Sequence, residues 1–331
     1  MNKGILLKSR PVGRPQISDF EFITEDMPIA ETGEIILKTI YVSVDPYLRG
    51  RMSDAKSYIP PFQLEKPVQS GIVAEVLESK NNKFLKGDFV AGSLDWKTFQ
   101  KSNGAGLLKI KPSEVPLSAY QGILGMTGLT AYFGLTEIGK PKSGETIVVS
   151  GAAGAVGMVV GQIGKIFGCR VVGIVGSDEK VELLKTKFKF DDAINYKTTP
   201  NIYKSIAKSC PDGIDIYFDN VGGEISDAVL SLINKFARVI ICGAIANYND
   251  TELPVGPRVQ SKLLVKSALM QGFIVSDFSN KIPQAIVQLT NWFQEGKIIN
   301  QETIVEGFEN IPQAFIDLFD GKNQGKMMVK I

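Results

Sequence analysis

The chain has 331 residues, of which 44% are hydrophobic and 22% are charged, and its formal net charge is +2. This length favours two domains, and the composition is that of an ordinary globular protein. So small a net charge, without long runs of one sign, argues against a nucleic-acid-binding surface. Because no apolar stretch is long enough to span a bilayer and the N-terminus lacks a signal-peptide pattern, we expect a cytoplasmic protein that does not enter membranes.

Residue counts exclude several kinds of catalytic site. The sequence has no histidine and three widely spaced cysteines, Cys169, Cys210 and Cys242. Without an imidazole there is no Ser-His-Asp or Cys-His catalysis. Catalytic zinc sites usually carry at least one histidine, so we expect no metal site. Three distant cysteines do not form a disulfide framework.

The first third of the chain predicts β-structure. Short apolar segments at 34–43, 71–77 and 88–92 are separated by Gly, Pro and Asn, which is typical of a small barrel-like domain. Residues 118–135 then predict a helix, because Gly, Ala and Leu recur there every three to four positions.

From residue 146 onward, apolar strands alternate with amphipathic helices. Nearly continuous apolar strands with helices between them predict a parallel sheet covered on both faces, the doubly wound arrangement. The predicted strands are 146–150, 170–175, 193–195, 214–218 and 237–242, and the predicted helices are 155–168, 178–187, 201–209 and 223–234.

The C-terminal part predicts a helix at 282–295, a strand at 302–306, a helix at 312–319 and a strand at 326–331. The apolar segment 265–275 has two interpretations. It fits an edge strand that pairs across a dimer axis, and it fits a buried strand equally well.

A glycine-rich turn follows the first predicted parallel strand. Gly151, Gly154 and Gly157 stand three residues apart between that strand and the next helix. Such glycines allow a tight turn, a close approach of the backbone to a pyrophosphate and close packing of helix on strand. The helix start then offers free N–H groups to the phosphates, so the pattern predicts a dinucleotide site.

The end of the second predicted strand indicates which dinucleotide binds. NAD enzymes usually carry Asp or Glu at this position, whereas this chain has Gly176 there, with Ser177 and Lys180 close by. A hydroxyl and an ammonium group suit a 2′-phosphate, which favours NADPH. Asp178 and Glu179 fit the first turn of the next helix, where acidic groups oppose the helix dipole.

At this point the sequence resembles the zinc-independent medium-chain dehydrogenases/reductases, in particular the prostaglandin reductases and alkenal double-bond reductases. The resemblance covers the whole chain. Its most specific motifs are VDPYLRGRM at 44–52, MTGLTAY at 126–132, GAVG at 154–157, VGSDEK at 175–180, FDNVGG at 218–223, CGAI at 242–245 and EGFENIP at 306–312.

The resemblance implies an α/β protein with a GroES-like β-barrel domain for substrate and catalysis, residues 1–120 with 300–331. It also implies a Rossmann doubly wound NADPH-binding domain at 121–299. The implied activity is NADPH-dependent reduction of the C=C bond of small hydrophobic enones or enals. The resemblance also implies a homodimer. The sequence departs from some members at 261–267, where it has no tyrosine.

The resemblance also implies contacts with the cofactor. The phosphate turn is Ala153, Gly154, Ala155 and Val156, and Ser177, Lys180 and Tyr196 meet the 2′-phosphate. The nicotinamide side is lined by Asn220, Cys242, Gly243, Ala244, Ile245, Tyr248, Phe273, Ile274 and Val275, and Asn323 reaches it from the C-terminal tail.

Several of these residues also have purely structural interpretations. Asn220 and Asn323 are typical turn residues, Tyr196 fits an ordinary half-buried tyrosine, and Cys242 fits a small buried apolar side chain. The position of Asn220 after a parallel strand favours the ligand-binding interpretation, because such sheets bind ligands at this edge.

Hydride addition to an enone leaves negative charge on the carbonyl oxygen, which an enzyme must stabilise. Without a metal, the donor is a hydroxyl, an amide or the ribose of the cofactor. We therefore hypothesise that Tyr47 or Tyr248 orients or protonates the enolate, with a packing role as the alternative for each. Two other functions stay open: a zinc-free quinone reductase and a non-catalytic NADPH-binding protein.

Overall fold

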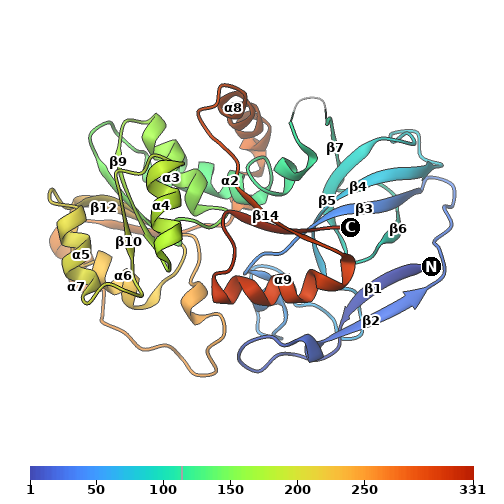
Figure 1. Cartoon of the computed structure of the whole chain (residues 1–331), viewed down its shortest axis with the longest axis horizontal. Helices are drawn as coiled ribbons and strands as arrows, with labels where there is room; N and C mark the ends of the chain where they lie inside the picture. Colours follow the sequence, from blue (N-terminus) through green and yellow to red (C-terminus); the bar gives the residue numbers. More distant parts are fainter. Residues whose placement is uncertain (113–114) are drawn as a thin grey trace. The chain divides into compact units, whose positions relative to one another are not determined.

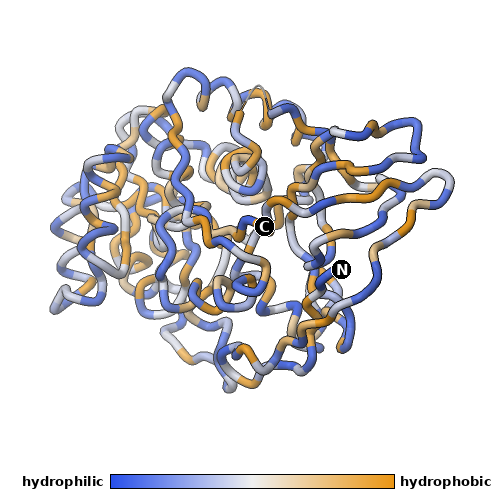
Figure 2. Tube along the Cα trace, turned by 45° about the vertical axis from the view of Figure 1, so that its right-hand side comes forward, coloured by the Kyte–Doolittle hydropathy of each residue, from blue (hydrophilic) through white to orange (hydrophobic). Residues whose placement is uncertain are grey.

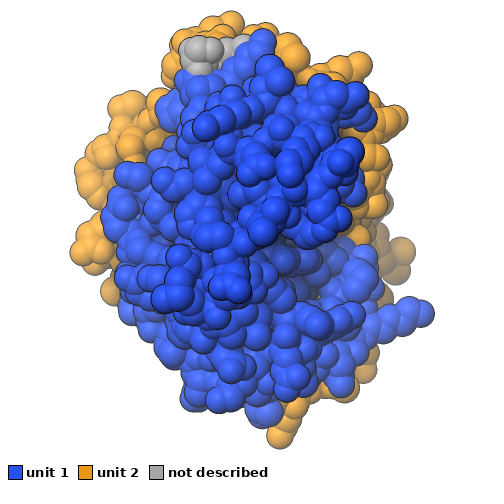
Figure 3. Space-filling view, turned by 90° about the vertical axis from the view of Figure 1, so that its right-hand side faces the viewer, with its two compact units in different colours: residues 1–121, 302–331 blue, residues 122–301 orange. Residues whose placement is uncertain are grey.

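The computed structural model describes residues 1–112 and 115–331. The chain forms two compact units, which Figure 3 shows in separate colours. Unit 1 comprises Met1–Gln121 and Glu302–Ile331, and unit 2 comprises Gly122–Gln301. Each unit has its own sheet and its own hydrophobic core.

Unit 2 is built on a parallel sheet whose strand order is β10-β9-β8-β11-β12-β13. Figure 1 labels its strands β9, β10 and β12. The strands are β8 Thr146–Ser150, β9 Arg170–Val175, β10 Asp192–Asn195, β11 Ile214–Asp219, β12 Ile233–Ile241 and β13 Leu269–Gly272. The helices are α2 Met126–Phe133, α3 Gly157–Ile166, α4 Asp178–Thr186, α5 Ile202–Ser209, α6 Gly223–Val229, α7 Gln260–Lys266 and α8 Ile282–Gln294. The doubly wound fold predicted from the sequence is confirmed.

The sequence forms this sheet because its central strands are apolar along their whole length. All five residues of β8 are buried, and five of the six residues of β9 are buried. A strand that is buried on both faces has no polar face to alternate with, which is the pattern of a parallel sheet covered by helices. Figure 2 shows this hydropathy along the trace.

The strand order reverses between β8 and β11. From β8 the chain continues outward to β9 and β10, and it then returns to place β11 on the other side of β8. Doubly wound sheets bind dinucleotides at this reversal, outside the carboxyl ends of the strands. The residues that follow these strands are therefore the first place to look for a site.

Two predicted helices have different bounds in the structure. The helix predicted at 223–234 is wrong beyond Val229, because α6 ends there and Ile233 already begins β12, where it pairs with Ile214. The helix predicted at 118–135 is also shorter. A 3₁₀ turn at Leu117–Gln121 precedes α2, which starts only at Met126.

The segment 265–275 contains the end of α7 and the short strand β13. In the described sheet β13 is the last strand and pairs with β12 alone, so the buried-strand interpretation is wrong, whereas pairing across a dimer axis stays a prediction. The adjoining α7 exposes 80% of Leu264 and 75% of Val265. Unit 2 therefore has an apolar surface next to an open strand edge.

Unit 1 contains a mixed sheet in the order β14-β15-β3-β4-β5-β7, with β6 paired to β3, and a β1-β2 hairpin-like pair. The strands are β1 Asn2–Leu7, β2 Phe20–Glu25, β3 Ile35–Ser43, β4 Gln69–Ser79, β5 Phe89–Asp95, β6 Phe99–Ser102, β7 Leu108–Ile110, β14 Glu302–Glu306 and β15 Lys326–Lys330. Its helices are α1 Leu48–Arg51 and α9 Ile311–Asp317. The C-terminal tail thus returns to the N-terminal sheet, as the GroES-like fold implies.

Within residues 1–112 and 115–331, no helix combines the length and the apolar character that crossing a membrane requires.

Candidate functional site

The predicted site residues of unit 2 lie at one edge of its sheet. Each group directly follows the carboxyl end of a parallel strand, and parallel strands end at the same edge. The groups are Gly151–Gly157 after β8, Ser177 and Lys180 after β9, Tyr196 after β10, Asn220 after β11, Cys242–Tyr248 after β12, and Phe273–Val275 after β13. The structure therefore brings together six segments that are far apart in the sequence.

The glycine turn after β8 has the geometry that its sequence predicts. Gly151 adopts a left-handed backbone with φ of 58°, which glycine tolerates best. A Cβ on Gly157 would lie 2.5 Å from the Gly151 carbonyl oxygen and 2.7 Å from the Ala152 Cα. Both contacts are too short for real side chains, so only glycine allows α3 to start this close to the turn.

The start of α3 is open to an anion. Val156 is its N-cap residue, and no side chain caps the helix there. The first turn of a helix carries partial positive charge, and here the Met158 N–H already donates to the Gly154 carbonyl at 3.1 Å. Gly154, Ala155 and Val156 are also only partly buried. These features fit the phosphates of a dinucleotide, which bind to uncapped N–H groups at such a turn.

Basic and polar side chains surround Gly176 at the ends of β9 and β10. A Cβ on Gly176 would lie 3.1 Å from Tyr196 Cε1, 3.2 Å from its hydroxyl and 3.3 Å from Lys197 Cε. The pKa of Lys180 is lowered, first by burial and then by the positive charge of Lys197. The two ammonium groups repel each other, and a phosphate bound beside them and the tyrosine hydroxyl would compensate their charges.

Ser177 and Tyr196 have further roles here. The Ser177 hydroxyl accepts a hydrogen bond from the Lys180 N–H at 3.3 Å, so it caps α4. Asp178 and Glu179 occupy the first turn of α4, as expected from the sequence. Tyr196 is 41% exposed, which fits both a half-buried tyrosine and a side chain open to a ligand.

Sequence reasoning missed Lys197. It follows the third strand directly after Tyr196, and the position of a basic residue at a parallel strand end was the available signal.

The turn after β11 packs against the turn after β12. Ala246 N–H donates to the Val221 carbonyl at 3.0 Å, and Ile245 N–H donates to the Asn220 carbonyl at 3.4 Å. Gly222 has a φ of 74°, and a Cβ there would lie 3.3 Å from the Ala244 Cβ. The two turns therefore fix each other's position.

Tyr248 folds back over its own turn. Its hydroxyl accepts a hydrogen bond from the Ala244 N–H at 3.4 Å, and a Cβ on Gly243 would lie 3.0 Å from the same hydroxyl. In this bond the hydroxyl oxygen is the acceptor, so the turn fixes where the phenol group lies.

Cys242 stands at the start of the same turn. Burial, with a smaller contribution from the negative charge of Asp219, raises the pKa of its thiol to about 12. A thiol is nucleophilic only as the thiolate, so Cys242 stays protonated and inert near neutral pH.

The segment Phe273–Val275 rests on an aromatic cluster. The Phe273 and Phe218 rings meet edge to face at 6.5 Å, and Phe278 lies 6.3 Å from Phe273. A Cβ on Gly134 would lie 2.7 Å from both Phe218 and Phe273, so this glycine leaves room for the rings. Ile274 N–H donates to the Asp277 carboxylate at 3.0 Å and fixes the turn that follows.

Tyr47 belongs to unit 1, where it packs against the hydrophobic core just before α1. Burial raises the pKa of its phenol well above the usual value, and the negative charge of Asp45 adds to this effect. Tyr47 therefore stays protonated and is a hydrogen-bond donor at any physiological pH.

Asp45 is held by a buried cation. Lys326 Nζ donates to Asp45 Oδ1 at 2.8 Å and to the Val44 carbonyl at 2.9 Å, and Ser43 hydrogen-bonds to the other carboxylate oxygen. Because Lys326 is in β15, this ion pair ties the C-terminal strand to the segment that carries Tyr47.

Asn323, also in unit 1, makes a local hydrogen bond. Its side-chain amide donates to the Gly325 carbonyl at 2.9 Å, which is the turn interpretation of this residue. Its side-chain oxygen has no role in that bond.

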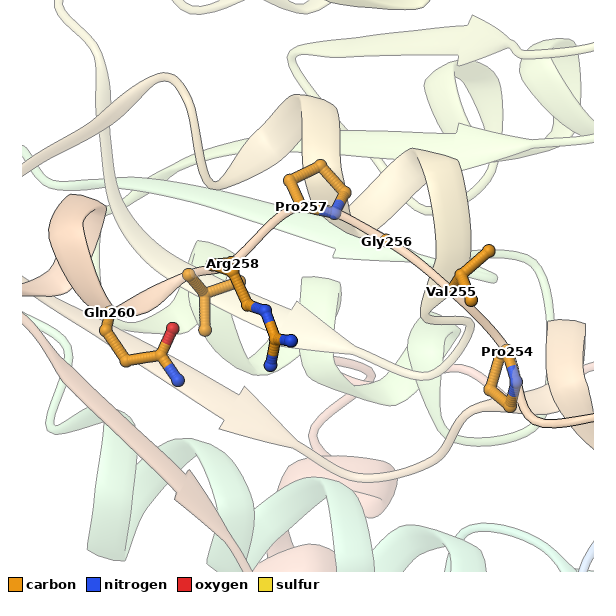
Figure 4. A pocket seen from close by; sticks show the side chains of 7 residues that line it. Pro254, Val255, Gly256, Pro257, Arg258 and Gln260 are labelled. Carbon is orange, nitrogen blue, oxygen red and sulfur yellow. The ribbon is translucent and has the colours of Figure 1, made fainter.

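A hollow of about 370 Å³ lies along the extended segment 254–260 of unit 2. Figure 4 shows the residues that line it, with the Arg258 and Gln260 side chains projecting from the segment. The hollow includes none of the predicted site residues, so it is not the centre of the candidate site.

Two family comparisons cover most of the chain. Residues 3–110 match a family described as the N-terminal domain of oxidoreductase, and residues 155–291 match one described as zinc-binding dehydrogenase. The name of the second family refers to zinc, whereas this sequence has no histidine. In the part of the chain that the structure describes, no three or more Cys, Asp or Glu side chains are grouped so as to hold a metal ion.

Individual relatives extend over the whole length. YfmJ of Bacillus subtilis (strain 168) is 57% identical over 329 residues, which are 99% of this chain and 97% of that protein. The NADP(+)-dependent 2-alkenal reductase of Nicotiana tabacum is 42% identical over 335 residues, which are 100% of this chain and 97% of that protein.

Among solved structures, the crystal structure of CurA in complex with NADPH from Vibrio vulnificus has a TM-score of 0.94 and 44% sequence identity. The match covers 99% of this chain and 98% of that chain. The fold, the two family matches and these relatives agree with the motifs of the sequence, and the chain therefore belongs to the zinc-independent medium-chain dehydrogenase/reductase family, the branch of the prostaglandin and alkenal reductases.

Proposed function

We propose that this chain is an NADPH-dependent oxidoreductase that reduces the C=C bond of α,β-unsaturated ketones and aldehydes. Hydride goes to the β-carbon and a proton to the α-carbon. The observation that carries the cofactor is the basic cluster of Lys180 and Lys197 beside Tyr196, one strand away from the glycine turn. The substrate class is supported by the 2-alkenal reductase relative.

NADPH fits the residues at the sheet edge, and it would supply the hydride. The uncapped start of α3 would hold the pyrophosphate, and Ser177, Lys180, Tyr196 and Lys197 would hold the 2′-phosphate. The turns after β11, β12 and β13 would line the nicotinamide side. The residues proposed there are Asn220, Cys242, Gly243, Ala244, Ile245, Tyr248, Phe273, Ile274 and Val275, with Asn323 from the tail.

The two units would have different functions. We propose that residues 121–299 form the cofactor-binding domain, and that residues 1–120 with 300–331 form the substrate and catalytic domain. The support is that the glycine turn and the basic cluster are in unit 2, whereas the buried phenol of Tyr47 is in unit 1.

The chain's own contribution to catalysis would be a neutral hydrogen-bond donor at the carbonyl oxygen of the substrate. Negative charge grows on that oxygen as the enolate forms, and a preorganised donor stabilises it. Tyr47 stays protonated because burial raises its pKa, and the Tyr248 hydroxyl is held at its turn by the hydrogen bond that it accepts from the Ala244 N–H. Either hydroxyl has the chemistry that this step requires.

A homodimer would cover the open edge of unit 2. In the described sheet β13 has a partner on one side only; its own Leu269 is exposed, and so are Leu264 and Val265 of the preceding α7. Open strand edges with apolar neighbours are usually covered in folded proteins. Light scattering coupled to gel filtration tests this: a dimer that Leu269→Lys converts to a monomer supports it, and a wild-type monomer contradicts it.

Steady-state oxidation of NADPH tests the activity. The substrates are an α,β-unsaturated ketone, its saturated analogue and a quinone, with NADH assayed in parallel. Oxidation with the unsaturated ketone alone, faster with NADPH than with NADH, is the expected result. Turnover mainly with the quinone would make the chain a quinone reductase, and cofactor binding without any turnover would make it a binding protein.

A further inference from the structure

A buried carboxylate lies at the end of β11, directly before the turn that would face the nicotinamide. Asp219 is 2% exposed. Its Oδ1 accepts hydrogen bonds from the Ser150 hydroxyl at 2.9 Å, the Tyr217 hydroxyl at 2.9 Å, the Val221 N–H at 3.0 Å and the Gly222 N–H at 2.9 Å. Four donors on one oxygen fix the turn in a single conformation, because each would be left unsatisfied in another.

Ser150 extends this network to Asn220. The Asn220 N–H donates to the Ser150 hydroxyl at 2.9 Å, and the Asn220 side-chain amide donates to the Ser150 carbonyl at 2.8 Å. The amide nitrogen of Asn220 is thus engaged with the protein. Its Oδ1 remains as the group with which Asn220 accepts a hydrogen bond, so the network also decides the chemistry that Asn220 presents.

The backbone of Asp219 holds the neighbouring turn as well. Its carbonyl oxygen accepts hydrogen bonds from the Cys242 N–H at 2.9 Å and the Gly243 N–H at 3.1 Å. One residue therefore connects the ends of β8, β11 and β12, which lie where the strand order reverses.

We propose that Asp219, together with Ser150 and Tyr217, is a positioning residue that presets Asn220 and the adjoining turns for the nicotinamide half of NADPH. This inference rests on the proposed function. The network would support binding of the nicotinamide half of the cofactor, whereas the cluster around Gly176 would bind the adenine half. Preorganised groups gain affinity because less ordering is needed on binding.

The same strand contains a matched control. Asp215, near the other end of β11, accepts hydrogen bonds from the Thr146 N–H at 2.9 Å and the Asn234 side chain at 2.9 Å. Asp215 and Asp219 thus tie β11 to the same neighbour, β8, at opposite ends. Only Asp219 is at the edge where ligands bind, so the pair separates positioning from simple support of the sheet.

Calorimetric titration of two ligands tests the proposal. NADPH spans both halves of the site, whereas adenosine 2′,5′-bisphosphate has only the adenine half. In Asp219→Asn the new amide turns an NH₂ donor or a weaker acceptor toward groups that are themselves donors. We expect its Kd for NADPH to rise about tenfold or more, since unpaired buried groups have that effect. Its Kd for the bisphosphate should stay within about twofold of wild type.

Asp215→Asn should change neither Kd, although it alters the two hydrogen bonds that Asp215 accepts from Thr146 and Asn234. If Asp219→Asn does not fold, Ser150→Ala and Tyr217→Phe take its place. Ser150→Ala should again weaken NADPH binding selectively, because the Ser150 hydroxyl contacts both Asp219 and Asn220.

A folded Asp219→Asn that binds NADPH as wild type does would overturn the proposal, and so would equal weakening of both ligands. The proposed function fails differently, namely when the wild-type chain binds neither NADPH nor the bisphosphate.

Discussion

Lys326 in unit 1 and Lys180 in unit 2 are both withdrawn from solvent, but their neighbours differ. Lys326 is 1% exposed and its ammonium group lies 2.8 Å from the Asp45 carboxylate, itself buried. Lys180 lies near Lys197, and burial together with that second positive charge lowers its pKa. The Lys326 ammonium is paired with an anion of the fold, whereas the pKa of Lys180 is lowered by burial and Lys197 and only partly restored by Glu179.

The difference separates stability from binding. A buried cation that is paired with a buried anion is compensated inside the fold, so it holds β15 to the segment before Tyr47. Two cations near each other raise the energy of the empty fold, and an anion from outside relieves it. The first arrangement is structural, whereas the second fits the 2′-phosphate of the proposed cofactor.

Removing the buried cation should have the largest effect. Lys326→Met leaves the Asp45 carboxylate buried without a partner, which is expected to lower the free energy of unfolding by about 3–5 kcal/mol. Urea denaturation measures this. Lys330→Met is the control, because Lys330 is exposed on the same strand and its ion pair with Glu306 at 3.6 Å contributes at most about 1 kcal/mol. Equal effects of the two substitutions would contradict the structural role of Lys326.

Loss of the hydroxyl of Tyr47 or Tyr248 should lower the turnover number and leave the free energy of unfolding unchanged. If Tyr47 or Tyr248 donates to the enolate oxygen, Tyr47→Phe or Tyr248→Phe should reduce kcat about 10²–10³-fold, which is the usual effect of losing such a donor. Stopped-flow rates of NADPH oxidation with an enone measure it, with Tyr203→Phe as an exposed control in α5. Full activity in both variants would leave the cofactor ribose or solvent as the proton source.

Lys180 and Lys197 should determine the preference for NADPH over NADH. Lys180→Met and Lys197→Met are each expected to weaken NADPH binding about tenfold, because each removes a charge-assisted hydrogen bond to the 2′-phosphate. NADH binding should hardly change. Lys204→Met is the matched control, since Lys204 is an exposed lysine of the same unit. Equal losses for NADPH and NADH would show that the lysines act through the fold instead.

A smaller effect should appear with pH. The pKa of Lys180 is lowered, so its charge is lost at a lower pH than that of an ordinary lysine. The phosphates of adenosine 2′,5′-bisphosphate are fully ionised above pH 8, so only the protein titrates there. Affinity should be complete well below the Lys180 pKa and fall as the pH rises through it, at a lower pH than an ordinary lysine would require. Lys180→Met should flatten this profile, and an unchanged slope in that variant would assign the titration to another group.

Local patterns account for what the sequence predicted. The glycine turn, the parallel strands and the acidic first turn of α4 depend on neighbouring residues, so they could be predicted from the sequence alone. The end of α6 was not, because Ile233 leaves the helix to pair with Ile214 in the sheet. The role of Asp219 was missed for the same reason, because its partner Ser150 is distant in sequence.

The fate of the hydride tests the central claim most directly. The chain is incubated with NADPH deuterated at the transferable position and an α,β-unsaturated ketone, and the product is examined by NMR. We predict a saturated ketone with deuterium on the β-carbon and a solvent proton on the α-carbon. Deuterium on the former carbonyl carbon, in an alcohol, would contradict alkene reduction.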